Sequence, residues 1–313
     1  MSQTAHTEGF AFTVPAQEIE KVSLQFSAEE IEIHSAAADE ITIQKMYKDG
    51  TPYTGDRPMI MDLEAGVLCF RNTPAKLRPF PDRSVIILYV PDNYSGSLTV
   101  EAHSGAIMLM CIRGASLACS VRSGHLRLHD CRFQEKIKVS ARSGCLDLEK
   151  VTAPALQLEC FSGTIRCRET ECTDFVSEIH SGKQDVEVQA AQSCRLSARS
   201  GKLRFCGQAP CLETSTKSGP QYLETENLEK ADMTAISGSI TLAVHEAPRL
   251  DEINLRLVSG QAALSLPSDV MPAVSIPSRT GRLRCDRDAF SADGRSVRIN
   301  AGIKSGSLRI IAH

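Results

Sequence analysis

A short repeat decides the fold, and it is clearest in residues 120–149, which read SVRSGHLRLHDCRFQEKIKVSARSGCLDLE. The dipeptide Ser-Gly occurs here at Ser123 and again at Ser143, and apolar residues alternate with polar ones on both sides of it. Alternation with a period of two is typical of a half-buried strand. Ser-Gly favours a sharp turn, because glycine adopts positive φ without steric cost and the Ser hydroxyl bonds nearby backbone. The stretch therefore predicts a strand, a corner and a second strand.

The same dipeptide recurs along most of the chain, at intervals of 18 to 22 residues from Ser104 to Ser259. It begins at Ser104, Ser123, Ser143, Ser162, Ser181, Ser200, Ser218, Ser237, Ser259 and Ser305, and Thr280-Gly281 is a variant. Self-similarity at a fixed period is the signature of a repeat architecture.

Apolar residues keep fixed positions around each corner. Three residues after the Ser are Ile107, Leu126, Leu146, Ile165, Gln184, Leu203, Gln221, Ile240, Ala262, Leu283 and Leu308. Five residues after it are Leu109, Leu128, Leu148, Cys167, Val186, Phe205, Leu223, Leu242, Leu264, Cys285 and Ile310. Two residues before it are Ala102, Val121, Ala141, Cys160, Ile179, Ala198, Thr216 and Ala235. We expect an all-β fold, a single-stranded β-solenoid (β-helix-like) with coils of about 19 residues and Ser-Gly corners, each coil stacked about 4.8 Å above the previous one.

Three regions follow from the regularity of the repeat. We expect an N-terminal extension over residues 1–20, irregular β coils that form an N-terminal cap continuous with the solenoid over residues 21–94, and a regular solenoid with a C-terminal closing strand over residues 95–313. In the irregular region, alternation predicts strands over residues 21–26, 31–33, 41–44, 67–70 and 85–90.

Composition excludes several classes of protein. The chain has 313 residues, 42% of them hydrophobic, and a net charge of −3 with Lys and Arg spread along it, which disfavours nucleic-acid binding by a basic face. Its longest apolar run, residues 106–112, is too short for a transmembrane segment. No signal peptide is visible, so we expect a cytoplasmic protein, with the cell surface as the alternative if an export signal precedes this sequence.

Cysteine usage points to the same compartment. The twelve cysteines include no CxxC pair, and no HExxH motif accompanies the eight histidines, so we predict neither a metal site nor a cofactor. We interpret the cysteines as small buried apolar residues in a reducing environment.

The order of these elements resembles a known family. Paired strands in residues 21–44 (KVSLQFSAEEIEIHSAAADEITIQ) precede a strand that ends in Pro in residues 85–109 (VIILYVPDNYSGSLTVEAHSGAIML). Serial Ser-Gly coils follow, then VSGQAALSLPSD in residues 258–269 and VRINAGIKSGSLRI in residues 297–310. This resembles the bacterial β-strand-repeat family of unknown function labelled "putative adhesin", over about residues 20 to 313. The resemblance implies an all-β solenoid and supplies no catalytic residues.

Two columns of residues are expected to point outward. Immediately before the Ser lie the candidate site residues, a basic stripe that Phe161 interrupts once: His103, Arg122, Arg142, His180, Arg199 and Lys217. They predict a face for an anionic polymer or an acidic protein partner, and the alternative is that they are simply solvated side chains. Four residues after the Ser, the signs alternate through Arg127, Asp147, Arg166, Asp185 and Arg204, which predicts a ladder of cross-strand ion pairs.

Enzymatic activity has little support in the sequence. The repeated Ser-Gly is a turn device and lacks the strand-to-helix context of a nucleophile elbow. We therefore expect a non-enzymatic scaffold or interaction module with an unidentified partner. The alternatives are a cell-surface adhesin that binds an anionic polymer or glycan and, more weakly, a carbohydrate-active enzyme. Oligomeric state stays open.

Overall fold

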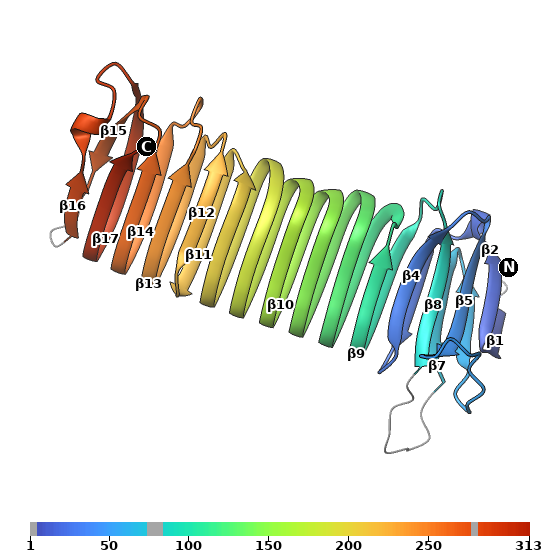
Figure 1. The fold of residues 1–313 in the computed structure, drawn as a ribbon. Coiled ribbons are helices and arrows are strands. Elements are labelled where there is room, and N and C mark those ends of the chain that lie inside the picture. The colour runs from blue at the N-terminus through green and yellow to red at the C-terminus, as the bar shows by residue number, and fades with distance from the viewer. Residues whose placement is uncertain (1–4, 74–83, 277–280) are drawn as a thin grey trace. The chain divides into compact units, whose positions relative to one another are not determined.

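The computed structural model describes residues 5–73, 84–276 and 281–313 (Figure 1). They divide into two compact units, Met1–Gln157 (unit 1) and Leu158–His313 (unit 2). In the described residues every element is a strand except two 3-10 turns, η1 (Ala16–Glu18) and η2 (Arg287–Ala289). The predicted all-β class is confirmed. None of the helical turns in this part of the chain has the length and hydropathy to cross a membrane.

Unit 1 holds the strands that precede the regular repeat and the first of the regular coils. They are β1 (Ala5–Gly9), β2 (Ala11–Pro15), β3 (Lys21–Phe26), β4 (Glu30–Ala36), β5 (Glu40–Tyr47), β6 (Met59–Glu64), β7 (Val67–Asn72), β8 (Ser84–Pro91), β9 (Ser97–Met110) and the first part of β10 (Arg113–Gln208). The five strands predicted in this region are confirmed as β3, β4, β5, β7 and β8, while β6 was not predicted.

The first coil of unit 1, formed by β3 and β4, lies between two others. On one side it pairs in parallel with β7 and β8, and on the other side with β9. Beyond β7 and β8, the antiparallel strands β6 and β5 occupy the next positions. Because that side is filled, β9 stacks on the first coil and not on the strands that precede it in sequence. The expectation that each coil stacks on the previous one is wrong at this point.

Residues 5–18, which the sequence placed in an N-terminal extension, contain β1, β2 and η1. β1 pairs antiparallel with β6, and β2 pairs antiparallel with β5. The described part of the expected extension thus belongs to the sheet. The predicted boundary at residue 95 concerns the regularity of the repeat and stays a prediction; the division between the compact units falls elsewhere, after Gln157.

Unit 2 holds the remaining regular coils. It contains the rest of β10, then β11 (Cys211–Ser218), β12 (Gln221–Glu226), β13 (Lys230–Val244), β14 (Glu252–Leu266), β15 (Val270–Ser275), β16 (Gly281–Cys285) and β17 (Arg295–Ala312). The corner serines pair in register from one coil to the next, as Ser200 with Ser218, Ser218 with Ser237, Ser237 with Ser259 and Ser259 with Ser305. Figure 1 shows β11, β13, β14 and β17 side by side in this order. The predicted parallel β-solenoid is confirmed.

The closing strand β17 departs from serial stacking. It pairs with β14 on one side and with both β15 and β16 on the other, so it is inserted between strands that precede it in sequence. We expected the corner at residues 280–281 to lie between those at Ser259 and Ser305, and this order is wrong. Ser259 pairs in register with Ser305, and Gly306 pairs with Gly281 on the other side. Thr280 lies outside the described residues.

Two corners with left-handed or positive φ shape several of the regular coils. The glycine of each Ser-Gly corner from Ser104 onward adopts positive φ, for example +145° at Gly124 and +135° at Gly201. A second corner, seven residues after the Ser, was not predicted. There Cys111, Asp130, Lys150 and Glu169 adopt left-handed φ between 47° and 58°. Left-handed φ is costly for residues other than glycine. Because these four positions hold other residues, nothing in the sequence indicated a corner there.

The core consists of the three predicted columns. Their members in the described residues are buried, with exceptions in β16, where Leu283 is 42% exposed and Cys285 is half-buried. Stacked aliphatic side chains thus form a thin interior, and residues one position away point to solvent.

Candidate functional site

The predicted stripe lies at the surface, as two sets that belong to different units. In unit 1, His103, Arg122 and Arg142 are exposed. In unit 2, Arg199 and Lys217 are exposed and His180 is half-buried. The alternation therefore places all six residues as expected, while their binding role stays a prediction.

In unit 2 the position before the corner Ser forms a continuous line of side chains. We call it the corner row, and its members are Phe161, His180, Arg199, Lys217, Ile236 and Val258. The pairing of Ala198 with Thr216 and of Ser200 with Ser218 brackets Arg199 and Lys217 at the same position of adjacent strands. The buried residues two positions before each Ser anchor the strands from inside, so the row faces outward.

Direct contacts order the first half of the corner row. The Phe161 and His180 rings are stacked, with centroids 4.4 Å apart and planes 15° from parallel. Arg199 Nη1 lies 3.4 Å from His180 Nε2. Because a guanidinium carries only donors, His180 Nε2 accepts this hydrogen bond, which leaves the imidazole proton on Nδ1. Phe161, which interrupts the stripe in sequence, is therefore part of the same arrangement.

Apolar side chains lie at both ends of the charged part of the row. Phe161 is 56% exposed at one end, and Ile236 and Val258 are 46% and 42% exposed at the other. Single exposed apolar side chains are common at protein surfaces, but exposed apolar side chains that line up indicate a binding site. The row thus offers apolar, cationic and again apolar contacts on successive coils.

A second ordered pair flanks the corners on their other side. Lys202 Nζ lies 4.7 Å from the centroid of the Tyr222 ring, a cation–π distance. Tyr222 pairs in register with Arg204, the last residue of the predicted alternating column. Sequence reasoning missed Tyr222, although its position four residues after Ser218 continues that column.

The sequence predicted ion pairs between successive members of the alternating column, but Arg127 and Asp185 form their ion pairs with residues outside that column. Arg127 Nη2 lies 3.4 Å from Glu149 and not within ion-pair distance of Asp147, and Asp185 pairs with Lys183 of its own strand at 3.3 Å. Long side chains reach diagonal neighbours as easily as direct ones. All four paired groups are partly exposed, so these pairs contribute little stability.

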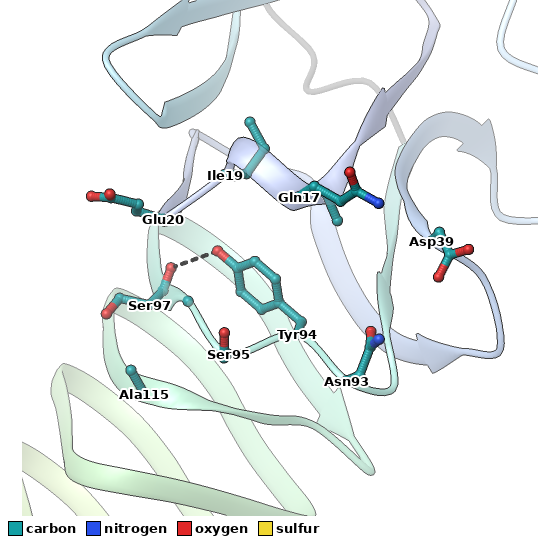
Figure 2. A pocket seen from close by; sticks show the side chains of 11 residues that line it. Gln17, Ile19, Glu20, Asp39, Asn93, Tyr94, Ser95, Ser97 and Ala115 are labelled. Carbon is teal, nitrogen blue, oxygen red and sulfur yellow. Dashed lines mark hydrogen bonds between the residues drawn. The ribbon is translucent and has the colours of Figure 1, made fainter.

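Unit 1 contains a separate polar hollow of about 380 Å³ (Figure 2). It lies between η1 and the loop that carries Tyr94, and its rim includes Gln17, Glu20, Asp39 and Asn93. Tyr94 is buried and its hydroxyl donates to the Ser97 carbonyl at 3.4 Å. Burial raises the pKa of Tyr94, so the phenol stays protonated and supports the loop without acting as a base.

The cysteines divide by burial. Six are buried, namely Cys119, Cys131, Cys160, Cys167, Cys172 and Cys194, whereas Cys111 and Cys211 are exposed. Burial raises the pKa of Cys131 to about 11 and that of Cys172 to about 12. Thiols in this state are poor nucleophiles at neutral pH. The interpretation of cysteine as a buried apolar residue holds for these six and not for the exposed pair.

Comparison with known proteins supports the resemblance drawn from the strand order. The model of the family described as Toastrack DUF4097 matches residues 19–310. No curated protein matches the chain. One similar solved structure is a "putative cell adhesion protein" from Clostridium sporogenes ATCC 15579, with 7% identity, full coverage of both chains (100% of each) and a TM-score of 0.23. Another is a "putative adhesin" from Bacteroides fragilis NCTC 9343, with 10% identity over 99% of this chain and 97% of that one, and a TM-score of 0.28.

Proposed function

The chain belongs to the Toastrack DUF4097 family, and we propose that it is a non-enzymatic interaction module that binds an anionic partner through the corner row of unit 2. The observation that carries this proposal is the ordered set of Phe161, His180 and Arg199 on successive coils. Side chains that are already held in place lose little conformational entropy on binding, so more of the contact energy appears as affinity.

Charge supports an anionic partner. The whole chain carries a net charge of −3, yet Arg199 and Lys217 sit on adjacent coils of the row without an acidic residue between them in the row. Local cationic potential of this kind raises the rate of encounter with anions and weakens with salt. The exposed set His103, Arg122 and Arg142 gives unit 1 a row of similar character, which we propose as a second contact.

Charge reversal in the row tests the proposal. Arg199→Glu with Lys217→Glu should weaken binding to immobilised heparin, used as a general polyanion, at least tenfold at low salt. Arg282→Glu with Arg309→Glu changes the net charge equally at exposed positions outside the row and should have a much smaller effect. Equal losses in both variants, or none in the first, would overturn the proposal.

The unit 1 set needs its own variant. Changing Arg122, Arg142 and Arg199 together to Glu should abolish heparin binding while circular dichroism and the thermal midpoint stay unchanged. If Arg122→Glu with Arg142→Glu binds as tightly as the unaltered protein, the unit 1 set has no part in the contact.

We also propose that the protein has no catalytic activity and that it is cytoplasmic. A screen against neutral and acidic polysaccharides should show no release of reducing ends, and turnover of any of them would replace the binding module with a carbohydrate-active enzyme. Fractionation of the cells that make this protein should recover it in the cytoplasm. Cleavage by a protease added outside intact cells would instead favour the surface-adhesin hypothesis.

A further inference from the structure

We infer that the ligand of the corner row is a linear acidic polysaccharide that lies along it with about one sugar per coil. This inference rests on the proposed function and specifies the chemical class of the partner. It depends on two features of unit 2, the spacing of the polar groups and the apolar contacts beside them.

The first feature is periodicity. His180, Arg199 and Lys217 occupy the same position on successive coils, and stacked strands lie about 4.8 Å apart. An extended acidic peptide places side chains of one face about 6.7 Å apart, so it falls out of step with the row within two coils. A pyranose ring linked through opposite carbons is close to one coil spacing in length. A polymer with one carboxylate on every ring therefore keeps an anionic group within reach of each coil.

The second feature is the pattern of apolar contacts. Phe161 on one side of the polar groups, and Ile236 and Val258 on the other, are all more than 40% exposed. A sugar ring offers C–H groups that pack on aromatic and aliphatic side chains, while its carboxylate bonds to a guanidinium or ammonium. Inorganic polyphosphate has anions alone and gains nothing from these residues. The row thus favours a ligand that offers both apolar and anionic groups along its length.

The binding assay compares four probes at one salt concentration. Polygalacturonate should bind at least tenfold more tightly than polyglutamate or polyphosphate of equal total charge, and more tightly than vesicles of phosphatidylglycerol. Among galacturonate oligomers, affinity should rise with length and level off near six sugars, because the row occupies six coils, with Phe161 on the first and Val258 on the last.

Two variants separate this inference from the proposed function. Phe161→Ser with Ile236→Ser should weaken polygalacturonate binding about tenfold and leave polyphosphate binding unchanged. Leu283→Ser removes a similarly exposed apolar side chain outside the row and should change neither.

The outcomes are distinct. If the unaltered protein binds no polyanion, the proposed function fails and the inference fails with it. If it binds all four probes alike and Phe161→Ser with Ile236→Ser has no effect, the inference is overturned while the anionic contact stands. Preference for the vesicles or for polyglutamate would likewise overturn it, in favour of a lipid surface or an acidic protein.

Discussion

Gly201 packs so closely over Gly182 that a β-carbon on Gly201 would lie 1.8 Å from the Gly182 carbonyl oxygen. The same relationship holds between Gly124 and Gly105 in unit 1, again at 1.8 Å. Glycine is thus required at these corners for two reasons, the positive φ and the direct approach of the backbone of the next coil. The second reason is a tertiary one, and it explains why the Ser-Gly repeat is so regular.

The two reasons can be separated by alanine substitutions. Gly201→Ala should lower the free energy of unfolding by about 3 kcal/mol or more, because strain at φ +135° adds to a backbone clash. Gly50 has φ +83° with nothing within 4 Å of the added carbon, so Gly50→Ala should cost about 1 kcal/mol. Gly302→Ala, which meets neither problem, should be nearly neutral. Equal costs at Gly201 and Gly50, measured by urea unfolding, would contradict the close-packing argument.

A buried ion pair lies at the first corner of unit 1. Lys45 Nζ lies 3.7 Å from Glu29 Oε1, with both side chains buried, and Lys45 also donates to the Arg57 carbonyl at 3.1 Å. Lys45→Met leaves the Glu29 carboxylate buried without its cation and should cost about 3 to 5 kcal/mol in urea unfolding.

The matched control for that variant is Lys48→Met. Lys48 pairs with Glu30 at the surface of the same unit, where its side chain is 50% exposed, and its removal should cost less than about 1 kcal/mol. Similar losses in the two variants would mean that burial does not decide the contribution of these pairs.

Two glutamines replace aliphatic residues in the core of unit 2, and we expect opposite responses to leucine. Gln184 Oε1 is buried and has no hydrogen-bond partner among the described residues, although Nε2 donates to the Ser197 carbonyl at 2.6 Å. Gln221 is fully satisfied, since it accepts from Thr214 at 2.6 Å and donates to Thr216 at 2.9 Å.

Gln184→Leu should therefore leave stability unchanged or raise it by about 1 kcal/mol, as leucine restores the aliphatic column. Gln221→Leu should lower stability by about 1 to 3 kcal/mol because it leaves buried hydroxyls unpaired. Thermal and urea unfolding of the two variants measure the difference in stability. A greater loss of stability in Gln184→Leu than in Gln221→Leu would contradict the view that Gln184 is the less well paired of the two glutamines.

Alkaline pH should destabilise the protein through its buried thiols. Burial raises the pKa of Cys131 to about 11 from an ordinary value of 9.0, so the folded state keeps a proton that the unfolded state releases. Stability from this protonated thiol is complete below pH 9 and falls by about 1.4 kcal/mol per pH unit between pH 9 and 11. Cys172, with its pKa raised to about 12, acts in the same direction.

Comparison of urea unfolding at pH 8 and pH 10.5 tests this. Cys131→Ala with Cys172→Ala should show a smaller loss of stability between the two pH values than the unaltered protein. Cys111→Ala, at an exposed position, should keep the full pH dependence. An unchanged pH dependence in the double variant would exclude the buried thiols as its source.

The candidate site was predictable in its positions and not in its contacts. The residue before each Ser faces outward because side chains alternate along a strand, and this placed Arg199 and Lys217 correctly. That Phe161 stacks on His180, and that Lys202 lies over Tyr222, depends on side-chain rotamers of neighbouring coils. The predicted ladder failed for the same reason, since the Arg127 side chain extends to Glu149 and not to Asp147.

By itself the sequence determined the coil length, the Ser-Gly corner and the inward columns, because turn chemistry and period-two alternation are local properties of the chain. Only the tertiary structure decided which coil lies on which. In unit 2, β17 inserts between β14 and β16. In unit 1, β9 pairs with the first coil. The corner of that coil has no glycine, and its Ser27 carbonyl accepts a hydrogen bond from the Ser104 N–H at 2.8 Å. Strands of similar pattern offer similar edges for pairing, so their order depends on which edges other strands occupy, namely β5 and β6 in unit 1 and β15 and β16 in unit 2.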